Sequence, residues 1–232
     1  MAKFTDFVVS EAASRYGVQL KDLNLLGSHQ NVVYGYSREG REYILRITHK
    51  SHRSQELIQG ELDWISYLSM NGVLVSRPIC SNNGLLIESL MNEDEGFFFV
   101  AFEKALGDRW TNAIFQDEEF KRHGTVVAKM HALSKSYKPG GLKTRRLPWN
   151  KSEYLTDFIQ NVPSSQRRVI SHFNALMRKL EALPRDSESF GLIHGDFCYG
   201  NYFIQADGSV TVFDFDECQY GWFVQDIAVN LF

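Results

Sequence analysis

The sequence predicts an α+β fold in which a sheet with one main helix comes first and mostly helices follow. Up to about residue 102, apolar residues alternate or cluster in short runs bounded by glycines and polar turns, which is typical of strands. After Gly107, apolar residues recur at helical spacing over three longer segments. Strands followed by helices indicate an α+β protein or two lobes that share a cleft.

The first half of the chain contains two pairs of strands, each beside a helix. Glycines directly after the two helices, Gly17 and Gly72, support their ends, because glycine commonly follows a helix C-terminus. A polar turn at 38–41 joins the first pair of strands, and an acidic loop at 92–96 joins the second. The expected elements are helix 4–16, strands 31–37 and 42–48, helix 55–70, and strands 85–90 and 97–102.

The second half is expected to be helical up to a short region of strands near its end. The helical patterns cover 118–136, 151–160 and 163–183, and the last is bounded by prolines at both ends. Two apolar runs with a polar turn between them follow within 192–215. We therefore expect a strand-loop-strand segment to complete the described pattern.

Charge and cysteine content exclude several classes of protein. With 25 basic and 28 acidic residues the net charge is −3, so no basic field exists for nucleic acid or an anionic membrane. The basic clusters at 143–146 and 167–168 are interpreted as solvated surface. Three cysteines without CxxC spacing, no signal-peptide core and no long apolar run predict a cytoplasmic protein without a membrane segment. Its oligomeric state cannot be predicted from these patterns.

Four polar residues in the 194–216 segment form the candidate chemical centre. Asp196 and Asn201 are five residues apart, and Asp214 and Asp216 end the strand that follows. A tight loop and a hairpin would bring these side chains to the mouth of a cleft. Carboxylate and amide oxygens suit Mg²⁺, which keeps waters and substrate phosphates as its other ligands. A carboxylate that does not bind the metal can accept a proton from a hydroxyl.

The same segment resembles the catalytic loop and metal-binding motif of protein kinases, H-R-D-x-x-x-x-N followed by D-F-G. Here it reads His194-Gly195-Asp196-x4-Asn201 and then Asp214-Phe215-Asp216. Glycine in place of arginine at position 195 is the form of aminoglycoside phosphotransferases, choline kinases and related small-molecule kinases. The resemblance implies a two-lobed protein-kinase-like fold and transfer of the γ-phosphate of ATP, with Mg²⁺, to a hydroxyl of a small molecule.

The resemblance also implies individual roles. Asp196 is expected to be the catalytic base, while Asn201 and Asp214 bind the nucleotide through the metal. Asp216 remains open between a further metal contact and a loop cap, and Asp226 is expected to brace the catalytic loop. His194 is interpreted as a structural residue below the loop. A zinc site at His194 lacks further Cys or His ligands at a suitable spacing.

Further upstream the resemblance is less specific. Arg46 occupies the strand position of the phosphate-binding lysine, and Glu61 that of its partner. The backbone of Glu103 and Ala105 is expected to receive the adenine. These positions predict an N-terminal nucleotide-binding lobe over 1–102, a hinge over 103–107 and a catalytic lobe over 108–232.

Three departures from the family pattern leave alternatives open, and the first is Arg46 in place of the expected lysine. The segment 27–35 lacks the G-x-G-x-x-G of a glycine-rich loop, and the chain ends at Phe232, where members of the family continue for several helices, so the catalytic lobe is expected to be incomplete. A protein Ser/Thr kinase would share the same centre, although only nine residues separate Asp216 from Asp226. A non-catalytic nucleotide-binding module is the other alternative.

Overall fold

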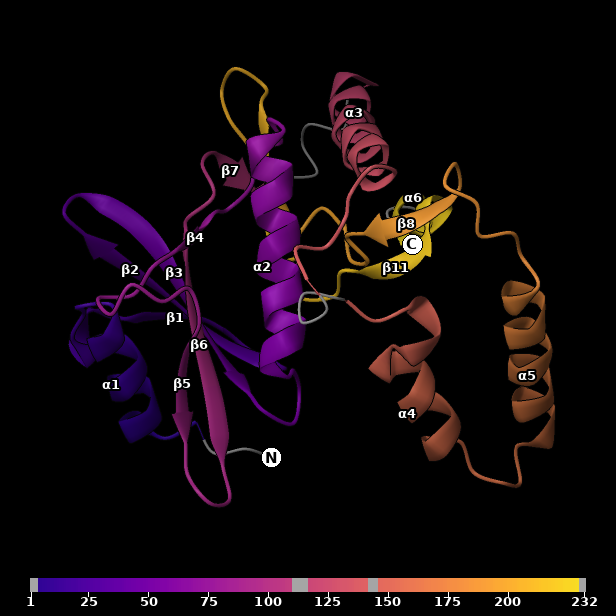
Figure 1. Ribbon diagram of the computed structural model, residues 1–232, viewed down its shortest axis with the longest axis horizontal. Helices are drawn as coiled ribbons and strands as arrows, with labels where there is room; N and C mark the ends of the chain where they lie inside the picture. Colours follow the sequence, from indigo (N-terminus) through magenta and orange to yellow (C-terminus); the bar gives the residue numbers. More distant parts are fainter. Residues whose placement is uncertain (1–3, 110–116, 142–145, 230–232) are drawn as a thin grey trace.

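The computed structural model describes residues 4–109, 117–141 and 146–229. Figure 1 shows a sheet with its covering helices on one side and a mostly helical region on the other, with the long helix α2 (Gln55–Met70) between them. This arrangement confirms the predicted α+β fold with two lobes.

The N-terminal lobe is built on one antiparallel sheet with the strand order β1-β2-β3-β6-β4, in which β5 also pairs with β6. The central hairpin was expected from the sequence, whereas the short edge strands β1 and β4 were not. The strands are β1 (Asn24–Ser28), β2 (Asn31–Arg38), β3 (Arg41–His49), β4 (Pro78–Ile79), β5 (Glu88–Met91) and β6 (Gly96–Glu103).

Strand β6 is buried on both faces, which explains its uninterrupted run of apolar residues. Phe97, Phe99 and Ala101 pack with α1 (Asp6–Arg15) in one core cluster. Phe98, Val100 and Phe102 point to the other face and pack with α2 in a second cluster. Because side chains alternate along a strand, one continuous apolar segment supplies both cores.

Helix α2 has the predicted bounds because both of its ends are capped. The Ser54 side chain accepts a hydrogen bond from the Leu57 amide at 3.4 Å, as an N-cap serine should. At the other end, Gly72 has a φ of 76°, in the left-handed region that glycine adopts without strain. The two caps fix the ends of the helix, and the helix thereby holds Glu61 at a fixed position beside the sheet.

Residues 104–107 connect β6 to the second lobe. They lead into β7 (Asp108–Arg109), which pairs with β9 (Tyr202–Ile204), and β9 pairs with β10 (Val210–Val212). Gly107 has a φ of 99°, and a Cβ there would collide with the Ile204 carbonyl. The connection therefore passes tightly against the hairpin that carries Asn201 and Asp214.

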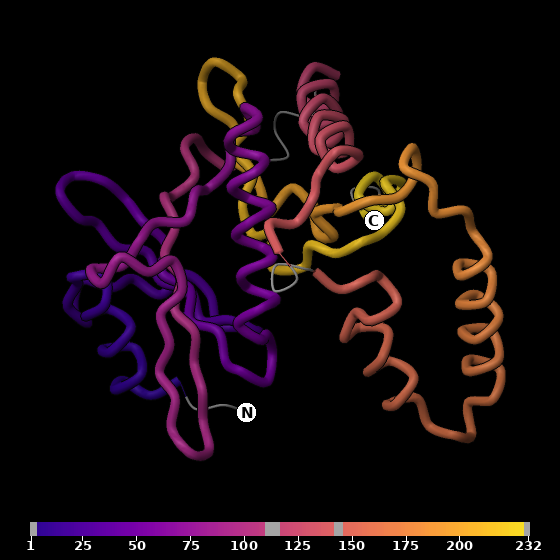
Figure 2. Tube along the Cα trace, viewed as in Figure 1, coloured from indigo at the N-terminus to yellow at the C-terminus, as the bar shows by residue number. Residues whose placement is uncertain are grey.

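The helices of the second lobe are α3 (Asp117–Ser134), α4 (Glu153–Asn161), α5 (Arg167–Glu181) and α6 (Phe223–Val229). Strands β8 (Phe190–Ile193) and β11 (Gln219–Trp222) pair with each other, and η1 (Leu20–Asp22) and η4 (Trp149–Lys151) are short 3₁₀ helices, η1 in the first lobe. The trace in Figure 2 follows α4 and α5 along the outer edge of this lobe. Helix α5 begins four residues later than predicted, because the segment after Pro163 forms a turn in which the Gln166 amide donates to the Pro163 carbonyl.

The predicted surface position of the basic cluster at 143–146 is wrong for Arg146. Its side chain is buried, because main-chain carbonyls surround its guanidinium. The other members of the cluster lie outside the described residues. Among the helices described, none has the length and apolar character needed to cross a membrane.

Candidate active site

A cleft of about 540 Å³ opens between the two lobes and contains the predicted centre. Part of its lining is apolar and comes from the N-terminal sheet and from residues in and next to the β9–β10 hairpin. The rest consists of polar and charged side chains from both lobes. The apolar wall residues are Val33, Ile44, Phe102, Phe203 and Phe213, and the polar residues include Arg46, Glu61, Asp196, Asn201, Asp214 and Asp216.

Arg46 and Glu61 form the predicted ion pair. The Arg46 guanidinium donates from Nη1 to Oε1 and from Nη2 to Oε2 of Glu61, at 2.8 and 2.7 Å. Both side chains are buried, and burial alone would lower the pKa of Arg46, but Glu61 holds it above the ordinary value. The bidentate geometry is one that arginine provides and lysine cannot.

Asp196 lies at the start of a tight turn that also positions Asn201. Nδ2 of Asn201 donates to the main-chain oxygen and to Oδ2 of Asp196, both at 2.8 Å. The second Asp196 oxygen and Oδ1 of Asn201 accept no hydrogen bond from the part of the chain that is described. One amide thus fixes the Asp196 carboxylate and leaves two oxygens available for ligands.

Asp214 lines the same cleft and follows strand β10 by two residues. Its backbone has a φ of 62°, which is uncommon outside glycine and directs the side chain out of the strand. Desolvation of its carboxyl by the surrounding protein raises the pKa to about 6, with the charge of Arg46 acting in the opposite direction. The residue lies open to the cleft.

Asp216 lies in a charged cluster with the loop between β3 and α2. His52 Nε2 is 2.9 Å and Arg53 Nη2 is 3.3 Å from Oδ2 of Asp216. Burial raises the pKa of this carboxyl, but the His52 hydrogen bond and the charges of Arg46 and Arg53 hold it well below its usual range. His52, Asp216 and Glu217 also lie near enough together to share a metal, but Arg53 already neutralises both carboxylates.

The other oxygen of Asp216 is in a different situation. Oδ1 is buried without a hydrogen-bond partner among the described residues, and Arg46 Nη1 lies 3.9 Å from it. Arg46 Nε is likewise buried and unpartnered in the part of the chain that is described. Buried polar atoms of this kind are normally satisfied, so they mark a place where a ligand or its metal fits.

Asp226 fixes the main chain at the start of the 194–201 loop. Its carboxylate accepts the amides of His194 at 3.1 Å and Gly195 at 2.8 Å, and it lies 3.0 Å from Nε2 of His131. His194 Nδ1 accepts the Asp196 amide, so Nε2 carries the proton and donates to the Phe213 carbonyl at 3.1 Å. Burial lowers the pKa of His194, although Asp226 opposes this. Both contacts agree with the structural roles expected for these residues.

Gly195 has a steric reason to be glycine. Its φ is 84°, and a Cβ would collide with the carbonyl oxygen of Glu217. Gly195→Ala is expected to lower the free energy of unfolding by more than the about 1–2 kcal/mol that a left-handed residue costs, measured by urea denaturation. Gly40→Ala is the matched control, since Gly40 has a φ of 73° with nothing within 4 Å. Equal losses in the two variants would contradict this account.

Of the two residues predicted to bind adenine, the structure places only one at the cleft. Ala105 lines the cleft, whereas Glu103 does not. The Glu103 side chain forms a bidentate pair with Arg77, at 2.8 Å for both bonds, and its amide donates to the Arg77 carbonyl. A role for Glu103 in nucleotide binding would therefore have to come from its carbonyl oxygen.

The sequence interpretation missed two groups of residues at the site. Phe203 and Phe213 belong to the apolar lining of the cleft, with ring centroids 4.8 Å apart. Their positions, two residues after Asn201 and one before Asp214, were the available signal. His52 and Arg53 belong to a connection without regular structure, so no periodicity indicated that they reach the second lobe.

Comparison with known proteins gives a consistent result. The model of the phosphotransferase enzyme family matches residues 23–232. Amicoumacin kinase of Bacillus subtilis (strain 168) is 34% identical over 226 residues, which are 97% of this chain and 67% of that protein. Uncharacterized relatives from Synechocystis sp. and Deinococcus radiodurans are 28% and 25% identical, and the chain spans 53% and 62% of their lengths.

Solved structures show the same fold. Amicoumacin kinase hAmiN in complex with AMP-PNP, Ca²⁺ and Ami has a TM-score of 0.93 at 34% identity, covering 99% of this chain and 69% of that one. A microcompartment-associated aminopropanol kinase has a TM-score of 0.78 at 24% identity, covering 98% and 74%. The predicted kinase-like fold and phosphotransferase class are thereby confirmed: the chain belongs to the phosphotransferase enzyme family.

Proposed function

We propose that this chain carries the centre of an ATP-dependent phosphotransferase that transfers the γ-phosphate to a hydroxyl of a small molecule. The observation that carries the proposal is the convergence of Asp196, Asn201 and Asp214 with the Arg46–Glu61 pair around one cleft. Phosphoryl transfer depends on positioning and on neutralising charge, and the cleft offers groups for both. The amicoumacin kinase relatives support the same class of reaction.

The apolar part of the cleft lining suits the nucleotide base. Val33, Ile44 and Phe102 contribute one wall and the two phenylalanines of the β9–β10 hairpin the other. Arg46 would hold phosphate oxygens, since Glu61 fixes its guanidinium in place. The main chain near Ala105 would contact the edge of the base. The apolar lining would provide a surface for the base, and Arg46 would provide positive charge for the phosphates.

The donor atoms fit a magnesium ion. Oδ1 of Asn201 and the Asp214 carboxylate are hard oxygen donors that open into the cleft, and Oδ1 of Asp216 is a further oxygen nearby. Magnesium, when bound, would neutralise charge on the phosphates. The Asp214 carboxylate would bind the magnesium ion when it is deprotonated, and the positive charge of Arg46 favours the deprotonated form. Asp216 serves mainly as the anchor for His52 and Arg53.

Asp196 would orient the acceptor hydroxyl and take its proton. Asn201 holds one carboxylate oxygen, so the other can face the acceptor. Amino alcohols, aminoglycosides, homoserine and sugars are the classes of acceptor that the resemblance implies. We place this reaction in the cytoplasm, where ATP is available and thiols such as Cys198 remain reduced.

A protein Ser/Thr kinase fits the geometry less well. Such an enzyme needs an extended activation segment after its metal-binding motif. Here β11 and the start of α6 occupy the residues between Asp216 and Asp226. A peptide-docking loop would have to replace secondary structure that packs against β8.

Turnover must be separated from binding to test the proposal. The purified chain would be assayed for ADP release with ATP and Mg²⁺ against a panel of amino alcohols, aminoglycosides, homoserine and sugars. Acceptor-dependent turnover that Asp214→Ala abolishes would support the proposal. A thermal shift with ADP and Mg²⁺ but no turnover on any acceptor would instead support the non-catalytic nucleotide-binding module.

A further inference from the structure

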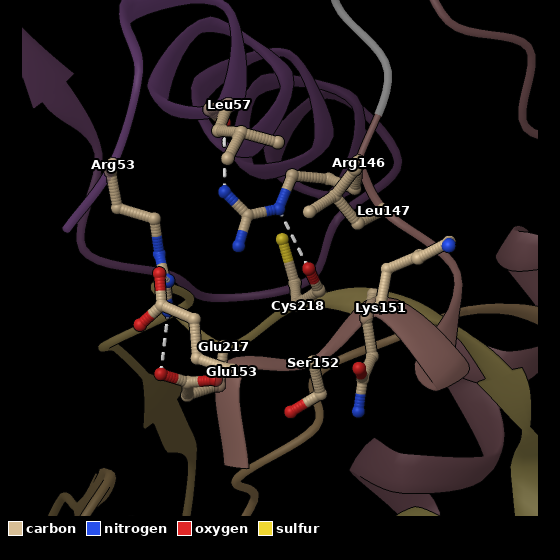
Figure 3. A pocket seen from close by; sticks show the side chains of 10 residues that line it. Arg53, Leu57, Arg146, Leu147, Lys151, Ser152, Glu153, Glu217 and Cys218 are labelled. Atoms are coloured by element: carbon tan, nitrogen blue, oxygen red, sulfur yellow. Dashed lines mark hydrogen bonds and ion pairs between the residues drawn. The ribbon is translucent and has the colours of Figure 1, made fainter. Parts of the chain in front are cut away.

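Arg146 occupies the space between α2 and the loop that follows Asp214. It stands at the start of the described segment 146–229, directly before Leu147 and Pro148. Figure 3 shows its side chain extended toward Leu57 of α2 and toward Cys218, with Arg53 and two glutamates on the other side of the same pocket. Only 7% of the residue is exposed.

Within the described residues, the hydrogen bonds of this guanidinium all go to main-chain carbonyls. Nε donates to the Cys218 oxygen at 2.6 Å, and Nη1 donates to the Leu57 oxygen at 2.8 Å. Nη2 donates to the main-chain carbonyl oxygen of Asp216. One side chain therefore joins the first turn of α2 to the main chain of residues 216 and 218, in the loop that follows Asp214.

These carbonyls are next to the groups that matter for phosphate and metal. In an α-helix the carbonyl of Leu57 also accepts the amide of Glu61, four residues later. Asp216 is two residues beyond Asp214, and the Cys218 amide closes a turn on the Phe215 carbonyl. Arg146 thus connects the turn that carries the partner of Arg46 to the turn that follows Asp214.

Its own backbone is anchored in the second lobe. The Tyr220 amide donates to the Leu147 carbonyl at 2.9 Å, and Pro148 forms a bridge with Tyr220. The planar guanidinium presents donors in several directions at once, whereas a lysine ammonium is a compact charge on a flexible stem. Three carbonyls at diverging positions therefore require arginine.

We propose that Arg146 is a positioning residue that sets the separation between the Arg46–Glu61 pair and the metal-binding Asp214. It touches neither substrate nor metal, and acts through the main chain of α2 and of residues 216–218. This inference rests on the proposed function, because it assumes that Asp214 holds the metal of a nucleotide complex.

Metal binding in the presence of ADP tests the proposal without measuring turnover. Mn²⁺ would be titrated into the ADP complex and followed by electron paramagnetic resonance, for the unmodified chain and for Arg146→Lys. We expect Mn²⁺ affinity to fall about 10–100-fold, the range for losing a residue that orients a metal ligand. Binding of ADP without metal should be unchanged, and in turnover kcat should fall while KM for the acceptor stays the same.

A matched control and a rescue separate positioning from general damage. Arg38→Lys removes a guanidinium that donates to the Tyr16 carbonyl at 2.9 Å in the other lobe, and it should leave Mn²⁺ affinity unchanged. In Arg146→Ala, added ethylguanidinium should restore Mn²⁺ affinity and ethylammonium should not. Arg146→Lys with unaltered Mn²⁺ affinity, or equal effects of the two added cations, would overturn the proposal. Absence of Mn²⁺ binding by the unmodified ADP complex would instead refute the proposed function.

Discussion

Asp196→Asn is expected to lower kcat by about 10²–10⁴-fold, the usual contribution of a positioned general base, while ADP binding stays unchanged. Asparagine keeps the shape of the side chain and one oxygen for the hydrogen bond from Asn201 Nδ2. It has no carboxylate to accept the proton of an acceptor hydroxyl. The loss should therefore appear in kcat and leave the free energy of unfolding nearly unaltered.

Steady-state kinetics with the acceptor identified in the panel, together with ADP titration, would measure this effect. Asp207→Asn is the matched control, because Asp207 is an exposed aspartate in the turn between β9 and β10 whose carboxylate accepts hydrogen bonds from the amide and hydroxyl of Ser209. It makes the same change of charge a short distance along the chain. A kcat for Asp196→Asn close to that of Asp207→Asn would exclude Asp196 as the base.

The part of the site that could be predicted from the sequence consists of residues with short, fixed spacings. Asp196 and Asn201 fall within one turn, so their separation leaves little freedom in how they meet. The β2–β3 hairpin and the apolar face of α2 likewise follow from local periodicity, and together they bring Arg46 to Glu61. Local patterns determine these contacts because few residues lie between the partners.

Contacts between irregular segments of the two lobes could not be predicted in the same way. His52 reaches Asp216 and Arg53 reaches Glu217, each across 164 residues, from a connection with no repeating pattern. Arg146 looked like part of a solvated basic cluster, since nothing in its neighbourhood marks the carbonyls that it meets only in the folded chain. Buried charge that depends on distant main-chain acceptors leaves no periodic signal in a sequence.

The second large effect is expected at the Arg46–Glu61 pair. Arg46→Met should lower the free energy of unfolding by about 3–5 kcal/mol, because it leaves the Glu61 carboxylate buried without its partner. It should also weaken ATP binding, since the cation that would hold the phosphates is lost. Urea denaturation and nucleotide titration would measure the two losses separately.

The double variant Arg46→Met/Glu61→Leu separates stability from function. Replacing both members of a buried pair by apolar side chains removes the uncompensated charge, and such changes are often neutral for stability. We therefore expect the double variant to unfold at nearly the urea concentration of the unmodified chain while its affinity for ATP remains low. Recovery of ATP affinity together with stability would show that Arg46 has only a structural role.

The Arg77–Glu103 pair provides the matched control for the stability effect. It is also a bidentate pair, formed through Nε and Nη2 of Arg77 at 2.8 Å, but its side chains are 60% and 38% exposed. Arg77→Met should therefore cost no more than about 1 kcal/mol, as for other exposed ion pairs. The contrast between the two arginines would show that burial gives the Arg46–Glu61 pair its large effect, because both arginines make two hydrogen bonds of similar length to a glutamate.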